Sequence, residues 1–274
     1  MTSGCASTDR EMNVDRSEAA FWAAHLRNRN VDHASAQDGA LAVAGGYALC
    51  ANGTFLQYAI GAGTTRALRP DDLSVVRDFY QRRGLPPRLE LAETVLARDS
   101  HVLRAAGFFE DGVAMAVFQA DVNGPLEPPV LNRGLIEITT VRTAADRRGW
   151  IDVVVEAFSD TIPGDELPRL IRATELSAQA AQGLFVASLD GMRIGGGAVA
   201  IYGDLAFLFS AAVLPAYRGR GAHAALLASR LAFARTRGAI HAAFKTVPDS
   251  LPERSARRLG FARTHIRRRV RAVA

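Results

Sequence analysis

The sequence predicts a mixed α/β fold, in which a mixed, mostly antiparallel sheet is flanked by helices. An alternating strand pattern at 136–140 is followed by a helical pattern. A run that is apolar on both alternating faces, at 205–214, leads into a helix at about 222–237. With 274 residues, the chain has room for one large domain or for two of ordinary size.

A segment rich in proline and glycine divides the chain near its middle. Residues 121–134 read DVNGPLEPPVLNRG, with three prolines and two glycines. Proline lacks the N–H group that a central strand or a helix interior needs, so this segment is expected to be a linker. We therefore expect one domain over residues 1–125 and a second over residues 135–274.

The second half continues from its first strand and helix into a meander, a crossover helix and further alternating elements. Asp190-Gly191 marks a hairpin turn, because both residue types tolerate positive φ. Gly238 is suited to end the helix at about 222–237. The remaining expected elements are a strand at 239–247, a short helix at 252–260 and a strand at 261–270.

The first half weakly repeats this order. Residues 72–84 (DLSVVRDFYQRRG) resemble residues 225–238 (ALLASRLAFARTRG), and a strand pattern follows at 88–95. Where the second half has Arg-Gly-Arg-Gly, the first has TTRALRPDD at 64–72. Either the halves are repeats and the first has lost its glycine turn, or two unrelated α/β segments look alike.

Charge and composition do not by themselves indicate a nucleic-acid partner. The formal net charge is +5, and 32 of the 33 basic residues are arginines spread along the chain, Lys245 being the exception. The densest cluster is Arg267, Arg268, Arg269 and Arg271. It is interpreted either as a nucleic-acid contact or as a solvated face of an edge strand, where charge discourages edge-to-edge pairing. We favour the edge strand.

Two cysteines, Cys5 and Cys50, form neither a disulfide framework nor a metal-ligand spacing. The first residues lack the basic and apolar regions of a secretory signal, and no apolar run reaches membrane-spanning length. We expect a cytoplasmic protein without a metal or a membrane partner.

The stretch YRGRGAH, at 217–223, stands where a strand passes into a helix. A helix N-terminus carries partial positive charge and unpaired N–H groups, so acidic or capping side chains are expected there. This helix instead follows Arg218 and Arg220. An anion would resolve the conflict, with Gly219 and Gly221 allowing the backbone to close around phosphate oxygens. On local physics alone, a tight glycine turn with solvated arginines is equally consistent.

The wider pattern resembles the GCN5-related N-acetyltransferase (GNAT) family. Its pyrophosphate-binding signature is Arg/Gln-x-x-Gly-x-Gly/Ala, matched here by Arg218, Gly219, Arg220, Gly221, Ala222 and His223 after the lead-in AVLPAY. The RRLGF at 257–261 also looks like the end of the family's last conserved helix. The resemblance covers about 135–270 well and the first half loosely. The whole chain is similar to two-domain members whose first acetyltransferase-like domain has lost its cofactor turn.

The resemblance implies two tandem acyl-CoA N-acyltransferase-like domains, the second using acetyl-CoA as co-substrate. Pantetheine amides would pair with the backbone of Ala211, Ala212 and Val213, and the pyrophosphate would lie on the N–H groups of 219–223. An amine of a small-molecule or peptide acceptor would attack the thioester directly, without a covalent enzyme intermediate.

Three positions depart from the family pattern. His223 replaces a small residue at the end of the signature, and Ser255 stands where many members have an asparagine near the pantetheine arm. His265 stands where many have a tyrosine that protonates the leaving thiolate, a role that histidine can fill near neutral pH. Alternatively, His265 is an exposed strand residue beside arginines.

The sequence leaves the general base open. The strand at 205–214 has Ser210 as its only polar side chain. Glu137, Glu156 and His241 are candidates by position, although each also fits a structural role, and proton removal through water is a further alternative. The missing strand carboxylate motivates a rival function, a non-catalytic acyl-CoA-binding or interaction protein on the same fold.

Overall fold

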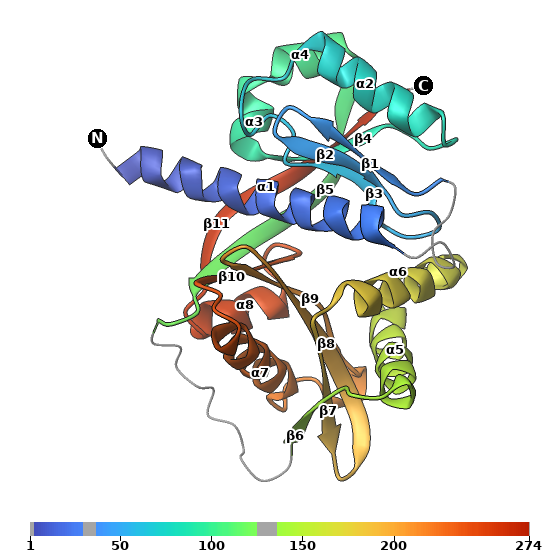
Figure 1. Cartoon of the computed structure of the whole chain (residues 1–274), viewed down its shortest axis with the longest axis vertical. Helices are drawn as coiled ribbons and strands as arrows, with labels where there is room; N and C mark the ends of the chain where they lie inside the picture. Colours follow the sequence, from blue (N-terminus) through green and yellow to red (C-terminus); the bar gives the residue numbers. More distant parts are fainter. Residues whose placement is uncertain (1–2, 30–36, 125–135, 274) are drawn as a thin grey trace. The chain divides into compact units, whose positions relative to one another are not determined.

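A computed structural model describes residues 3–29, 37–124 and 136–273 (Figure 1). It confirms the predicted mixed α/β fold. Contacts group the chain into two compact units, one of Met1–Val117 with Thr264–Ala274 and the other of Phe118–Arg263. Most of the expected linker, residues 125–134, lies outside the described residues.

The first unit is built on a mixed sheet. Its elements are α1 (Ser3–Asn28), β1 (Gly39–Val43), β2 (Gly46–Cys50), β3 (Gln57–Ile60), α2 (Pro70–Gln81), β4 (Arg88–Ala92), α3 (Glu93–Arg98), α4 (Ser100–Ala105), β5 (Phe108–Asp121) and β11 (Ala262–Ala272). The strand order is β1-β2-β3-β4-β11. Strands β3 and β4 run parallel, and the other pairs in this order are antiparallel.

Strand β11 comes from the end of the chain, yet most of it groups with the first unit. It pairs antiparallel with β4, placing Arg269 opposite Glu90. The units therefore group residues 264–274 with the first half and residues 118–124 with the second, unlike the expected boundaries at 125 and 135. Those domain boundaries stay a prediction.

Helix α2 covers the sheet of the first unit with an apolar face. Leu73, Val76 and Tyr80 are buried in one cluster with Leu89 of β4. The hydroxyl of Tyr80 donates to the carbonyl of Leu49 at 3.0 Å and accepts from its N–H at 3.1 Å. The spacing of these side chains follows the helical period, as expected of a helix with one buried face.

The second unit contains a meander followed by a crossover helix. Its elements are β6 (Ile136–Thr140), α5 (Ala144–Ser159), η1 (Gly164–Glu166), α6 (Leu167–Ala180), β7 (Gly183–Leu189), β8 (Met192–Tyr202), β9 (Leu205–Val213), η2 (Pro215–Tyr217), α7 (Ala222–Thr236), β10 (His241–Thr246) and α8 (Leu251–Arg258). The strand order is β10-β9-β8-β7-β6, with β10 and β9 parallel and the other pairs antiparallel.

Helices α5 and α7 cover opposite faces of β8 in this unit (Figure 1). Gly196 and Gly197, two of three consecutive glycines of β8, make room for them. A Cβ on Gly196 would lie 2.7 Å from Nε1 of Trp150 on α5, and a Cβ on Gly197 would lie 3.1 Å from Nε of Arg230 on α7. Because successive strand residues point to opposite faces, the glycines bring one helix close on each side.

The repeated order predicted for the two halves is observed. The first half has the order α2, β4, short helices (α3 and α4) and β5. The second half has the matching order α7, β10, α8 and β11. Helix α6 was not predicted as a separate element. Its buried residues are Leu170, Thr174, Leu176, Ser177, Ala178 and Ala180.

Candidate functional site

Strands β9 and β10 separate part-way along their length. They pair from His241 opposite Leu205 to Ala243 opposite Phe207. Strand β9 then continues to Val213 and β10 to Thr246 with no further pairing between them among the described residues. Ala211, Ala212 and Val213, the predicted pantetheine strand, therefore lie beyond the last paired residue, along the opening between the strands.

A β-bulge lies on β9 beside this opening. Phe209 pairs with Ala198 and Ala212 with Gly196, so three residue steps of β9 face two of β8. Ser210, inside the bulge, has φ of 48°, a left-handed conformation that non-glycine residues rarely adopt. A bulge redirects side chains and ends regular pairing, which suits the mouth of a binding site.

The turn after β9 leads into α7, whose first N–H groups are not capped by a side chain. Gly219 and Gly221 have φ of 79° and 92°, values that favour glycine. Gly221 is the N-cap of α7, with no side-chain cap and no acidic residue in the first turn. Within the described chain, the N–H groups of 219–224 have no recorded hydrogen-bond partner. The turn presents free donors at the positive end of a helix.

Arg218 is held by the protein itself. Its Nη1 and Nη2 donate to the two carboxylate oxygens of Asp160 at 2.7 and 2.9 Å, and Nε donates to the carbonyl of Val213 at 3.0 Å. This pairing lowers the pKa of Asp160 and raises that of Arg218. Arg220 lies 5.3 Å over the ring of Tyr217. The guanidinium of Arg218 thus fixes the turn to the end of α5.

His223 occupies the first turn of α7 with an unsatisfied ring nitrogen. Its Nδ1 is buried and has no hydrogen-bond partner among the described residues. Burial, aided by the charge of Arg230, lowers the pKa of His223 to about 4, so the ring is neutral at pH 7. Arg230 is itself buried, and its Nε donates to the carbonyl of Leu226 at 3.0 Å.

The corresponding helix start in the first unit is closed. Helix α2 begins with Pro70, which has no N–H group, and the carboxylate of Asp72 accepts from the N–H of Arg69 at 2.8 Å. Arg66 donates to both oxygens of Asp72 at 2.6 and 2.7 Å. The carboxylate of Asp72 supplies negative charge at this helix start from the chain itself. This agrees with the expectation that the first repeat lacks the glycine turn.

Most of the second unit matches a known protein family. Residues 147–261 match the model of the acetyltransferase (GNAT) family. The chain contains a GNAT domain. No curated protein sequence gives a significant match to the chain.

Solved structures extend the GNAT fold over most of the chain. A GCN5-related N-acetyltransferase from Kribbella flavida is similar with a TM-score of 0.64 and 16% identity, covering 94% of each chain. A GCN5-related N-acetyltransferase from Sphaerobacter thermophilus has a TM-score of 0.59 and 19% identity, covering 78% of this chain and 71% of the other. A tandem GNAT protein from the clavulanic acid biosynthesis pathway has a TM-score of 0.55 and 15% identity, covering 77% and 70%. At such identities the likeness shows the fold.

The match of the GNAT domain ends at Phe261, and His265 follows it on β11 in the first unit. Its Nε2 lies 2.9 Å from Oδ1 of Asp15 on α1, and its Nδ1 lies 2.9 Å from Oγ1 of Thr264. The residue is 8% exposed, so the alternative of an exposed strand residue is wrong. Both ring nitrogens are engaged inside the first unit.

The arginine cluster beside His265 is not one solvated face. Arg267 is fully buried and contacts three carboxylates, those of Asp15, Glu18 and Glu90, at 2.7, 2.7 and 3.3 Å. Strand β11 is also paired along β4 rather than free at that edge. The edge-strand interpretation was wrong because the compensating acids lie far away in the sequence.

The remaining candidates of the GNAT domain are dispersed. Ser255 is half-buried on α8, and its hydroxyl has no recorded hydrogen bond in the described part of the chain. His241 is paired with Leu205, two residues before the last pair of β10 with β9, so it lies outside the opening between these strands. Glu137 is exposed on β6 opposite Ser188. Glu156 lines a separate cavity on α5.

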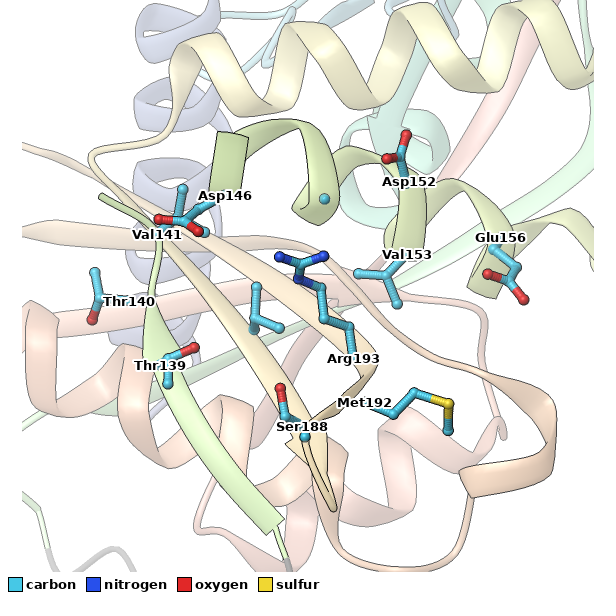
Figure 2. A pocket seen from close by; sticks show the side chains of 13 residues that line it. Thr139, Thr140, Val141, Asp146, Asp152, Val153, Glu156, Ser188, Met192 and Arg193 are labelled. Carbon is cyan, nitrogen blue, oxygen red and sulfur yellow. The ribbon is translucent and has the colours of Figure 1, made fainter. Parts of the chain in front are cut away.

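That cavity has a volume of about 770 Å³ and lies between α5 and strands β6, β7 and β8. Figure 2 shows Asp152 and Glu156 on α5, and Met192 and Arg193 on β8; all four residues line the cavity. Gly149 admits the guanidinium, since a Cβ there would lie 2.7 Å from Arg193. Of these residues, only Glu156 is a candidate predicted from the sequence.

The described residues contain no helix long and apolar enough to span a membrane. Among the same residues, no group of three or more His, Cys, Asp or Glu side chains is placed to hold a metal ion.

Proposed function

We propose that the protein is an acetyl-CoA-dependent N-acetyltransferase whose co-substrate site lies in the second unit. The observation that carries the proposal is the start of α7: two left-handed glycines, free N–H groups and no acidic residue, placed at the end of the β9–β10 opening. Helix α2 is the contrast within the same chain, because Pro70 has no N–H group to offer and Asp72 places a carboxylate at the helix start.

In this proposal the pyrophosphate lies on the N–H groups of residues 219–223, where the helix dipole and unpaired donors favour negative charge. The pantetheine arm follows Ala211 to Val213, whose outer edge has no partner strand in the described chain. Ser255 supplies a hydroxyl from α8 in place of the family's amide. Arg218 acts by holding the turn, since Asp160 occupies its guanidinium.

The acceptor is an amine of a small molecule or peptide. Its nitrogen attacks the thioester carbon, the C–N bond forms and the C–S bond breaks. The nitrogen gives up one proton to the base, and the leaving thiolate takes up a proton. The acid role of His265 stays a prediction, and its contacts with Asp15 and Thr264 favour a structural role. The base is also a prediction, divided between His241, Glu137, Glu156 and water. A cytoplasmic location stays a prediction from the sequence.

Calorimetric titration with acetyl-CoA tests the proposal. We expect the wild-type protein to bind and Gly221→Glu to lose binding, because the new carboxylate and Cβ occupy the helix start. Gly238→Glu is the matched control: Gly238 ends α7 in the same left-handed conformation, with φ of 79°. Absence of binding by the wild-type protein would overturn the proposal.

A non-catalytic acyl-CoA-binding protein is the second candidate, favoured by the lack of a carboxylate on β9. Thiol release measured over a panel of amines separates the two functions. Release above background supports the enzyme. Binding of acetyl-CoA with background release over the whole panel supports the binding protein.

A further inference from the structure

The cavity beside α5 lies outside the proposed co-substrate site. Its volume of about 770 Å³ falls within the range of about 300–1,000 Å³ that is typical of small-molecule pockets. Its lining residues come from α5, from strands β6, β7 and β8 and from the segments beside them, and none belongs to β9 or β10. Of the residues considered for the reaction, only Glu156 lines it. The cavity is therefore available to a second ligand.

This cavity contains charges of both signs that do not neutralise one another by contact. Asp152 and Glu156 lie on α5, and Arg193 lies on β8 (Figure 2). Among the described residues, these three side chains have no recorded hydrogen bond or ion pair. Asp146, the third carboxylate, accepts from the hydroxyl and the N–H of Thr143 at 2.8 and 3.2 Å. Three carboxylates and one guanidinium give the lining a net charge of −2.

The guanidinium of Arg193 lies against α5 at a point where the helix has no side chain. A Cβ on Gly149 would lie 2.7 Å from Cζ and Nη1 of Arg193, so the glycine leaves the room that the guanidinium occupies. Asp146 and Asp152 are three residues away on either side of Gly149, at positions that share one face of the helix. Neither forms an ion pair with Arg193 in the described chain. An unpaired guanidinium is suited to bind a carboxylate through two parallel hydrogen bonds.

The two free carboxylates of α5 are spaced for two ammonium groups. Asp152 and Glu156 are four residues apart, which places their Cβ atoms about 5–6 Å apart on a regular helix. An ammonium group has three N–H donors and no acceptor, so a carboxylate suits it. The cavity wall also includes Val153 and Val186, which are both buried. A short methylene chain that joins two ammonium groups can pack on such an apolar wall, as the stem of a lysine side chain does.

We propose that this cavity binds a free α-amino acid whose side chain ends in an amine, such as lysine or ornithine. The carboxylate of the ligand pairs with Arg193, its α-ammonium group with Asp152, and its side-chain ammonium group with Glu156. The ligand carries more positive than negative charge, opposite to the lining. The inference does not depend on the proposed function, because neither the start of α7 nor β9 takes part.

Calorimetric titration without acetyl-CoA tests the site with three related ligands. L-Lysine carries all three charged groups. Cadaverine is lysine without the carboxylate, and L-norleucine is lysine without the side-chain amine. We expect saturable binding of one lysine per chain. Cadaverine and norleucine should each bind at least roughly tenfold more weakly, because each leaves one charged group of the cavity without its partner.

Substitutions in the lining test where the lysine binds. Arg193→Gln, Asp152→Asn and Glu156→Gln should each raise the Kd for lysine roughly tenfold or more, the effect of one lost hydrogen-bonded charge pair. Arg172→Gln and Glu175→Gln are the matched controls, since both residues are exposed on α6 and have no recorded partner in the described chain. We expect both controls to keep the wild-type Kd.

Gly149→Ala tests the position of the guanidinium separately. The new Cβ would meet the end of a flexible side chain rather than backbone, so we expect the variant to fold with Arg193 displaced and with a raised Kd for lysine. Gly164→Ala is the control, because nothing lies within 4 Å of its Cβ position.

Absence of saturable lysine binding would overturn the inference, and so would equal Kd values for the wild-type protein and Arg193→Gln. Cadaverine that binds as tightly as lysine would overturn the pairing of Arg193 with a carboxylate. Norleucine that binds as tightly would overturn the pairing of Glu156 with a side-chain amine. Acetyl-CoA is absent from these titrations, so their failure leaves the proposed function standing. Failure of acetyl-CoA to bind likewise leaves this site standing.

Discussion

Arg218 and Asp160 form a two-point ion pair that ties the turn after β9 to the end of α5. The two N–O distances are 2.7 and 2.9 Å. A third bond, from Nη2 of Arg218 to the carbonyl of Ala157 at 3.0 Å, anchors the same guanidinium on the helix. The position of the free N–H groups at 219–223 therefore depends on a contact outside the turn.

Breaking this pair is expected to weaken acetyl-CoA binding without removing any proposed contact to it. Asp160→Asn should raise the Kd by roughly threefold to tenfold, because a neutral amide holds the guanidinium less firmly. Calorimetry measures the change. Asp72→Asn is the matched control, since it weakens the similar pair with Arg66 in the first unit. Equal Kd values for Asp160→Asn and the wild-type protein would contradict the anchoring role.

Protonation of His223 is expected to destabilise the fold in mild acid. Burial, with the charge of Arg230, holds its pKa at about 4, below the ordinary value of 6.5. The unfolded chain therefore binds a proton first, and stability falls as pH decreases from about 6.5 to about 4, by about 3 kcal/mol in total. Urea unfolding across this range measures the slope.

His223→Ala should flatten that part of the pH profile, whereas His101→Gln, at an exposed position on α4, should leave it intact. A profile of His223→Ala that parallels the wild-type curve would contradict the assignment. If acetyl-CoA places its phosphates on the start of α7, binding should also raise the pKa of His223. Calorimetry in buffers of different ionisation enthalpy would then detect proton uptake near pH 5.

The sequence was informative where the signals are local. The period of apolar residues predicted α7, the resemblance of residues 72–84 to that helix predicted α2, and Asp190-Gly191 predicted the β7–β8 turn. The turn at the start of α7 is predicted to bind an anion, because arginines and glycines precede a helix that has no acidic first turn. These features depend on residues within a few positions of one another.

Long-range pairing was not predictable in the same way. Asp15 and Arg267 are separated by 252 residues, so an arginine run looked like a solvated strand face. Arg218 was predicted to contact an anion, but its partner Asp160 stands 58 residues away. No periodicity in the chain indicates such pairs, because each is set by which strands and helices pack together.

The buried pair of Asp15 and Arg267 predicts an acid-sensitive step in the first unit. Burial alone would raise the pKa of Asp15, but Arg267 and His265 lower it to about 2. The stabilisation is present above pH 4 and is lost as pH falls toward 2, and it amounts to about 2 kcal/mol. Asp15→Asn should destabilise the protein by about 3 to 5 kcal/mol at pH 7 and should remove this step. Unfolding curves from pH 2 to pH 7 check both effects.

His265→Gln separates a structural role from the predicted acid role. Loss of the contact with Asp15 should lower the free energy of unfolding by roughly 1 to 3 kcal/mol. A kcat per folded molecule that stays at the wild-type value would remove His265 as the thiolate acid. A large fall in kcat with a shifted pH–rate profile would support that role.

Gly196 of β8 is expected to be sensitive to substitution because it sets the distance to α5. A Cβ at Gly196 would lie 2.7 Å from Nε1 of Trp150, which donates to the carbonyl of Phe185 at 3.1 Å. Gly196→Ala should therefore lower the free energy of unfolding by about 1 to 3 kcal/mol through overpacking. Gly164→Ala is the matched control, because nothing lies within 4 Å of its Cβ position.

The effect of Gly196→Ala should reach the proposed co-substrate site. Gly196 pairs with Ala212, on the far side of the bulge that holds Ser210. A shift of β8 that relieves the contact with Trp150 moves the edge of β9 along which the pantetheine arm is proposed to lie. We expect a weaker Kd for acetyl-CoA in the folded variant and an unchanged Kd in Gly164→Ala. Loss of stability with an unchanged Kd would show that α5 packing and the β9 opening are independent.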